Sequence, residues 1–262
     1  MLNINCPERD ASADIDTIIT EKYSGSVKTI LQLLKAKIKT RYSDYAKIEL
    51  NQRLIKTTFT DDEKKALKHL YGSQTTTAKK IIDIISKALL QTQAGCCVSC
   101  GIGDVDQIDH FLPQEHFPEY SILHKNLIPI CGLCNEIKSD NIPGEEKNYF
   151  HPMFDKLPDE PFFRCQITYV NNIPTSKFSI IPKFHTTIVN NHFVDLKLKV
   201  RLEKKATIYF VQMKDFKTKF GDDFANEEID RDLMKLGALY GSNYWKCILC
   251  LEMRNSNFVA NI

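Results

Sequence analysis

The middle of the chain carries two cysteine pairs whose spacing suits a tetrahedral metal ion. Cys97 and Cys100 form one C-x-x-C pair, and Cys131 and Cys134 form the other. Thiolates in close pairs are the usual ligands of structural Zn²⁺. Cys96 could replace Cys97, but only Cys97 leaves two residues between the ligands. Four thiolates leave zinc no open position, so we expect a structural ion; the alternative is reduced core cysteines without metal.

A second group of polar side chains lies between and just after the cysteine pairs. It contains an acid, a histidine, two asparagines and a lysine, namely Asp109, His110, Asn126, Asn135 and Lys138. Carboxylate and amide oxygens bind hard divalent cations, and histidine can take a proton from water near neutral pH. These are the parts needed to hold a cation and to activate a water molecule beside it.

The 30 residues between the two pairs must form structure of their own, because this gap is longer than a compact zinc ribbon uses. We expect strands at 105–110 and 126–130, and a short helix at 134–139. Pro113 would turn the chain away after the first strand. A module of about 50 residues is too small to be stable without a staple, which the zinc would supply.

In order along the chain, Asp-His, Asn-Leu and Cys-x-x-Cys-Asn-x-x-Lys resemble the motif of HNH nucleases, over residues 97–140. The resemblance implies a ββα-metal fold and hydrolysis of a phosphodiester bond. Asp109 and Asn135 would then bind a catalytic Mg²⁺ or Mn²⁺. His110 would be the general base, Asn126 would hold the loop that orients it, and Lys138 would contact a phosphate. Asparagine stands at the third motif position in place of histidine and still supplies an oxygen ligand.

Residues 109–155 also resemble HNH proteins of bacterial anti-phage defence systems, through Asp109–Pro113 and Phe150–Asp155. This resemblance implies a metal-dependent endonuclease acting on DNA, beside a partner ATPase or sensor protein. Two other functions stay open. One is a non-catalytic zinc module that binds nucleic acid or a protein partner, and the other is an HNH nuclease that cleaves RNA.

The flanking regions predict an α+β protein. Residues 1–94 are expected to be helical, because apolar residues recur at helical spacing and Thr60–Glu63 has the pattern of a capping box. Beyond the centre we expect strands at 162–170 and 177–181 with a turn at 171–174, and helices at 195–220 and 226–240. Within 195–220, Val200 and the run 208–211 leave a strand as the alternative. The predicted domains are a helical region (1–94), an HNH module with the four-cysteine zinc site (95–150) and a mixed α+β region (151–262).

Charge and composition indicate which partners and which cellular compartment to expect. The formal net charge is only +2, but segment 21–56 has nine basic residues against three acids, and segment 197–220 has eight against two. Such segments either follow a phosphate backbone or form solvated helix faces. No apolar run reaches the ~18 residues of a membrane span, and the N-terminus lacks a signal layout. The nine cysteines, five of them between 96 and 134, suit a reducing compartment. We therefore expect a cytoplasmic protein with no membrane contact.

The remaining histidines and cysteines predict structural roles. His116 and His124 are expected in a surface loop, and His151 is expected to pack rather than to contact substrate. Cys247-x-x-Cys250 lies in an apolar run without a partner pair nearby, so these cysteines are expected in the core.

Overall fold

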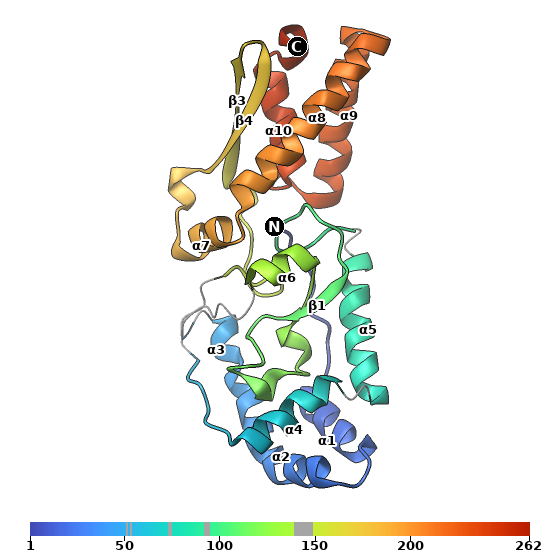
Figure 1. Cartoon of the computed structure of the whole chain (residues 1–262), viewed down its shortest axis with the longest axis vertical. Helices are drawn as coiled ribbons and strands as arrows, with labels where there is room; N and C mark the ends of the chain where they lie inside the picture. The colour runs from blue at the N-terminus through green and yellow to red at the C-terminus, as the bar shows by residue number, and fades with distance from the viewer. Residues whose placement is uncertain (51, 53, 73–74, 92–94, 139–148) are drawn as a thin grey trace. The chain divides into compact units, whose positions relative to one another are not determined.

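The computed structural model describes residues 1–50, 52, 54–72, 75–91, 95–138 and 149–262. The chain divides into two compact units, which Figure 1 shows. The N-terminal unit contains Asn3–Val98 and Asp104–Asp155, and the C-terminal unit contains Met1–Leu2, Ser99–Gly103 and Lys156–Ile262. Over the described residues the fold is α+β with two two-stranded antiparallel sheets, which confirms the predicted class. The division into three domains stays a prediction.

The N-terminal unit begins with a group of helices. They are α1 (Ala11–Glu21), α2 (Ser26–Asp44), α3 (Ala46–Glu49), α4 (Asp61–Gly72) and α5 (Thr76–Gln91). All of these except α3 contribute to an apolar cluster. The predicted capping box opens α4: Thr60 N donates to Glu63 Oε2 at 2.7 Å, and Glu63 N donates to Thr60 Oγ1 at 3.3 Å. The cluster also takes in Ile122 and Leu127, so the helices share their core with the central segment.

The central segment forms the strand, strand, helix order that the sequence predicts. Its elements are β1 (Gln107–His110), η1 (Pro118–Tyr120), η2 (His124–Asn126), β2 (Leu127–Ile130) and α6 (Gly132–Lys138). β1 pairs antiparallel with β2, with Asp109 opposite Ile128. α5 packs against both strands and covers one face of this sheet, so a site open to solvent must lie away from that face.

Several boundaries differ from the prediction. β1 begins at Gln107 rather than at residue 105, and α6 begins two residues before its predicted start. The earlier start has a local cause, because Asp106 Oδ1 accepts the Gly132 N–H at 2.7 Å and so caps the helix. Ser139, the predicted helix end, and Arg53 of the first basic segment lie outside the described residues.

The C-terminal unit joins a hairpin to a group of helices. Its elements are β3 (Phe163–Val170), β4 (Ile173–Ile180), η3 (Pro182–Phe184), α7 (Thr187–Asp195), α8 (Leu198–Phe220), α9 (Asp222–Tyr240), α10 (Trp245–Asn255) and η4 (Phe258–Asn261). α8 packs against β4, and α10 packs against β3 and α9. The fold therefore places the hairpin against helices that follow it in the chain.

Three expectations for this unit were wrong in detail. Ile173 and Pro174 lie in β4 and not in a turn, because Asn171 and Asn172 alone connect the strands, both with positive φ. This matches the type I′ turn, which suits the twist of a two-residue hairpin. The predicted helix at 195–220 is divided, since Lys197 has a left-handed backbone (φ 53°) and α8 starts after it. α9 starts at Asp222, four residues before the expected position.

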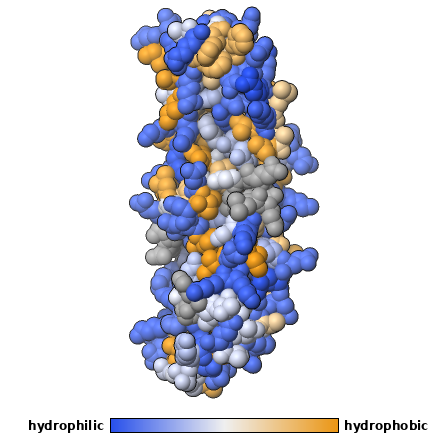
Figure 2. All heavy atoms as spheres, turned by 90° about the vertical axis from the view of Figure 1, so that its right-hand side faces the viewer, coloured by the Kyte–Doolittle hydropathy of each residue, from blue (hydrophilic) through white to orange (hydrophobic). Residues whose placement is uncertain are grey.

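The outer surface mixes polar and apolar side chains. Figure 2 shows orange residues exposed among blue ones, including toward the upper part of the view, where the helices α8 and α9 lie. Among the described residues, no helix has the length and apolar character that crossing a membrane requires.

Candidate functional site

The four predicted zinc ligands form one buried group. The Sγ atoms of Cys97, Cys100, Cys131 and Cys134 all lie within 4.8 Å of one another. This is the compact donor set that a tetrahedral zinc ion needs, so the group could bind zinc with all four positions filled. Cys96 is not part of it and instead forms an isolated β-bridge with Asp104. The structure thus selects Cys97 over Cys96, as the spacing predicts.

Four of the five predicted catalytic residues line one pocket in the N-terminal unit. Its volume is about 220 Å³, and its walls come from Asp109, His110, Pro113, Gln114, Glu115, Asn135 and Lys138. β1 supplies the acid and the histidine, the following loop supplies the middle residues, and α6 supplies the asparagine and the lysine. Residues about 26 positions apart in the chain therefore meet at one open site.

His110 is held by the loop that follows β1. The side chain is 8% exposed, and its Nε2 lies 2.8 Å from Ser121 O. A carbonyl oxygen can only accept, so Nε2 carries the hydrogen and Nδ1 is left as a proton acceptor. Gln114 Nε2 lies 2.6 Å from the same Nε2, and two N–H donors cannot bond to each other, so the Nε2–H tautomer requires the Gln114 amide to turn its oxygen toward the ring. The Tyr71 ring packs edge-on against the imidazole at 4.7 Å, which helps to fix the orientation of the ring.

Burial sets the protonation state of His110. The pKa of the imidazole is lowered to about 4, mainly by burial and in smaller part by the Lys138 ammonium, against the opposing effects of Ser121 O and Asp109. The ring is therefore neutral at pH 7, which is the form that a general base needs.

Lys138 lies beside the acid rather than in open solvent. Its side chain is 8% exposed, and Nζ donates to Asp109 Oδ2 and to His110 O, both at 2.6 Å. The ammonium thereby links the end of α6 to the end of β1. Its predicted contact with a phosphate stays a prediction, and its place in the pocket wall is compatible with one.

The predicted cation ligands offer two oxygens to the pocket. Asn135 Nδ2 donates to Gln107 Oε1 at 2.6 Å. This hydrogen bond does not use the amide oxygen, Asn135 Oδ1, which can therefore bind a cation. Asp109 uses Oδ2 for Lys138 and retains Oδ1. A donor set of one carboxylate and one amide oxygen fits Mg²⁺, which keeps several waters when proteins bind it.

Asn126 lies behind the pocket and not in it. It is fully buried, and its Oδ1 accepts from Leu112 N at 2.8 Å and from Tyr45 OH at 3.1 Å. Its Nδ2 donates to Leu112 O and to Tyr120 O, both at 3.2 Å. The side chain thus ties both ends of the loop that carries Gln114 and supports Ser121. Its catalytic importance stays a prediction.

Several supporting residues were not anticipated. Tyr45 and Tyr71 come from the helical region, and Ser121 Oγ donates to Leu67 O of α4 at 2.6 Å. Gln107 and Gln114 are ordinary polar residues in the sequence. The available signal was their position in the sequence. Gln107 lies two residues before Asp109, so the two share a face of the strand, and Gln114 lies four residues after His110 in the loop.

Of the other histidines, His124 overturns its prediction. It is 2% exposed and not at the surface of a loop, because it lies in η2 beneath α5, and burial lowers its pKa to about 4. His151 packs as expected: it is fully buried, with ring centroids 4.2 Å from Phe111 and 4.4 Å from Phe154. His116 is half-buried.

Cys247 and Cys250 are core residues, as the sequence predicts. Both are buried in α10, and burial raises the pKa of each thiol, to about 11 and about 12. A raised thiol pKa disfavours the thiolate, the form that binds metal and acts as a nucleophile. The surroundings of this second C-x-x-C pair therefore disfavour metal binding.

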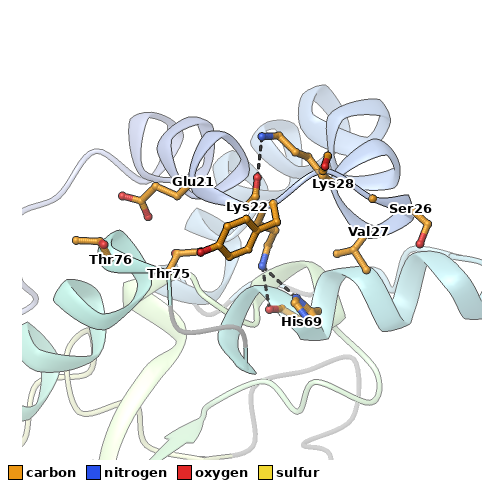
Figure 3. A pocket seen from close by; sticks show the side chains of 11 residues that line it. Glu21, Lys22, Ser26, Val27, Lys28, His69, Thr75 and Thr76 are labelled. Atoms are coloured by element: carbon orange, nitrogen blue, oxygen red, sulfur yellow. Dashed lines mark hydrogen bonds between the residues drawn. The ribbon is translucent and has the colours of Figure 1, made fainter.

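A larger pocket in the same unit, about 620 Å³, contains none of the predicted site residues. Figure 3 shows its lysines turned toward groups of the protein. Lys22 Nζ lies 3.1 Å from His69 Nδ1 and donates to His69 O at 3.3 Å, and Lys28 Nζ donates to Lys22 O at 2.7 Å. Both ammonium groups are already engaged, so we assign this pocket no chemistry.

Comparison with known proteins gives one partial relationship. The chain is 41% identical over 78 residues to protein ea31 of Escherichia phage lambda, which covers 29% of this chain and 25% of that protein. The chain thus matches about a quarter of its relative's length. No family model matches the sequence, and no solved structure matches the fold.

Proposed function

We propose that this protein is a metal-dependent HNH endonuclease that hydrolyses phosphodiester bonds of DNA. The observation that carries the proposal is the shared pocket: a fixed, neutral histidine lies beside an acid, an asparagine and a lysine. None of these contacts is needed for a module that only binds zinc and a partner.

The chemistry follows from the positions of the donors. Nδ1 of His110 takes a proton from a water molecule as the water oxygen bonds to phosphorus and the bond from phosphorus to the 3′ oxygen breaks. Asp109 and Asn135 would hold Mg²⁺ or Mn²⁺, which when bound offsets the charge that develops on the phosphate and the leaving oxygen. Lys138 holds Asp109 in place and adds positive charge to the wall that a phosphate would approach.

The four-cysteine group has a separate part in this proposal. Filled with zinc, it would fix Cys131 at the end of β2 and Cys134 in α6, and so would hold Asn135 and Lys138 opposite β1. Zinc would then be structural, and a second ion would serve the reaction.

Replacement of His110 tests the proposal. Purified full-length protein should cut supercoiled plasmid DNA when Mg²⁺ or Mn²⁺ is added and not when both are omitted. His110→Ala should lower the rate by about 10²-fold to 10⁴-fold, the usual contribution of a general base. The matched control is His116→Ala, a half-buried histidine of the same loop that does not line the pocket. Equal cleavage by zinc-loaded His110→Ala protein would make the module a non-catalytic zinc domain.

The substrate and the setting need their own measurements. Labelled DNA and RNA of one sequence, cut side by side, decide between DNA and the alternative, an RNA-cleaving enzyme. We propose bacterial anti-phage defence in the cytoplasm, with a partner ATPase or sensor protein, on the strength of the sequence resemblance alone. Similarity to a phage lambda protein fits a phage-encoded nuclease equally well, and the neighbouring reading frames would separate the two.

A further inference from the structure

The outward face of α8 in the C-terminal unit carries apolar residues that the fold does not use. The helix buries its opposite face through Leu198, Leu202, Ala206, Tyr209, Phe210 and Met213. Val200, Ile208 and Val211 lie on the other side and are 65%, 48% and 65% exposed. Their spacing of eight and three residues places them within one stripe along the helix. β-Branched residues have lower helix propensity than most others and gain no burial when exposed to water, so we expect the stripe to contact a partner.

A pocket opens at the N-terminal end of this stripe. It has a volume of about 490 Å³ and lies where β4, α7 and α8 meet. Apolar side chains form most of its wall: Phe178, Ile180, Phe193, Val194 and Val200. Val194 is itself 68% exposed, and Val200 belongs to both the pocket wall and the stripe, so the pocket and the stripe adjoin.

The rim of this surface is positively charged. Lys177, Lys197 and Lys199 line the pocket, and no carboxylate is among its lining residues. Lys199 Nζ lies 3.9 Å from Glu203 Oε1, whereas Lys177 and Lys197 form no ion pair within the described part of the chain. Lys204 is exposed between Val200 and Ile208. The surface thus combines apolar anchor positions with unneutralised ammonium groups.

We propose that this surface, the α8 face, binds an acidic amphipathic helix of a partner protein. Leucine-type side chains of such a helix would enter the pocket and cover the stripe, and its carboxylates would meet the lysines. The stripe from Val200 to Val211 spans about 16 Å at 1.5 Å per residue, which is three turns of a bound helix. This inference does not rest on the nuclease activity of the N-terminal unit.

Charge argues against two other occupants. A second copy of this chain related by a two-fold axis would bring the same lysines face to face. Duplex DNA would satisfy the lysines but offers a hydrated phosphate backbone to Val200, Ile208 and Val211. The apolar stripe therefore changes the interpretation of the basic segment 197–220, whose lysines were first considered for phosphate contacts.

The test uses the full chain and a designed probe. The probe is a fluorescein-labelled helical peptide with leucines at i, i+4, i+7 and i+11 and mostly glutamate elsewhere, and binding is followed by fluorescence anisotropy. We expect saturable binding with a Kd on the order of 10–100 µM, weakened by salt. A peptide of the same composition with scrambled leucines, and one with lysine in place of glutamate, should bind at least about tenfold more weakly.

Variants locate the binding on the α8 face. Val200→Ser and Ile208→Ser should each weaken the peptide about tenfold, and Lys177→Glu together with Lys204→Glu should do the same. The matched control is Met234→Ser with Leu239→Ser, two exposed apolar residues of α9. All of these positions are exposed, so circular dichroism should show unchanged folding.

Five outcomes would overturn the proposal. They are absence of saturable binding, equal binding of the scrambled peptide, and binding unaffected by Val200→Ser and Ile208→Ser. The fourth is self-association in sedimentation that these two variants abolish, which would assign the face to a second copy. A labelled duplex that binds more tightly than the peptide and responds only to the lysine changes would make it a nucleic-acid surface.

Discussion

Two buried histidines show how one residue type takes different roles in this protein. Burial lowers the pKa of both His110 and His124 to about 4. His110 lines the pocket beside Asp109, whereas His124 lies in η2 and is not part of that wall. The sequence shows the residue type and the motif order. It does not show that His124 is covered, because the covering helices lie far away in the chain.

His124 makes the stability of the fold depend on pH. The unfolded chain has the ordinary histidine pKa of 6.5, so it binds a proton between pH 6.5 and about 4 while the folded protein does not. The free energy of unfolding should therefore fall as the pH drops through this window, by up to about 3 kcal/mol from this residue, and should not depend on it above pH 6.5.

Urea unfolding at pH 5 and pH 7.5 measures this effect. His124→Gln removes the titrating group, so its free energy of unfolding should change less between the two pH values than that of wild type. His116→Gln is the control and should keep the wild-type difference. Two other buried histidines, His110 and His192 of α7, also have pKa values lowered to about 4 by burial, and they contribute equally in all three proteins. An unchanged pH difference in His124→Gln would contradict the assignment.

Among the elements, the loop after β1 depends on one amide side chain. Asn126 makes four hydrogen bonds from a fully buried position, two of them to the backbone of Leu112. Asn126→Ala leaves these groups without partners, so we expect a loss of about 2–4 kcal/mol in the free energy of unfolding. Asn135→Ala is the matched control at the pocket rim, and its stability should change by less than about 1 kcal/mol.

Measurements of cleavage activity should also distinguish the roles of Asn126 and Asn135. Asn126→Ala should lower cleavage through a displaced His110, while Asn135→Ala should raise the Mg²⁺ concentration needed for half-maximal rate. Equal free energies of unfolding of the two variants in urea would show that Asn126 does not hold the loop.

Local sequence signals predicted most of the helices and strands but did not predict the contacts between residues far apart in the chain. The motif order predicted β1, β2 and α6, and Thr60 with Glu63 predicted the start of α4. The loop support from Tyr45, 81 residues before Asn126, has no local signature. The length of β4 was missed because Asn171 and Asn172 close the turn alone, although Pro174 is also of a type that favours turns.

The β3–β4 turn offers a direct test of this interpretation. Asn172 has φ 61°, a left-handed conformation that glycine adopts without strain. Asn172→Gly should therefore raise the free energy of unfolding by a few tenths of a kcal/mol, to about 1 kcal/mol at most, and Asn172→Val should lower it by about 1–2 kcal/mol. Thermal unfolding of the two variants measures the difference, and a stabilising valine would exclude the type I′ turn.

At the scale of the molecule, the N-terminal helices and the central segment lie in one compact unit. Ile122 and Leu127 share an apolar cluster with α1, α2, α4 and α5. Arg41 of α2 donates to Glu119 Oε1 at 2.9 Å, and the Glu119 side chain is fully buried. The sequence shows the cysteines of this segment but not the core that it shares with the helices, and the division into three domains stays a prediction.

The four-cysteine group still leads to the sharpest prediction for the whole chain. We expect about one Zn²⁺ per purified chain by elemental analysis, and loss of that zinc with a lower thermal transition in Cys131→Ser. Cys247→Ser is the matched control: it also removes a buried cysteine of a C-x-x-C pair, so it should lower stability by about 1–3 kcal/mol while zinc is retained. Full zinc content in Cys131→Ser, or zinc lost in Cys247→Ser, would place the ion elsewhere. Because Cys131 follows β2 directly and Cys134 lies in α6, zinc loss should also reduce cleavage at saturating Mg²⁺, even though zinc takes no part in the reaction.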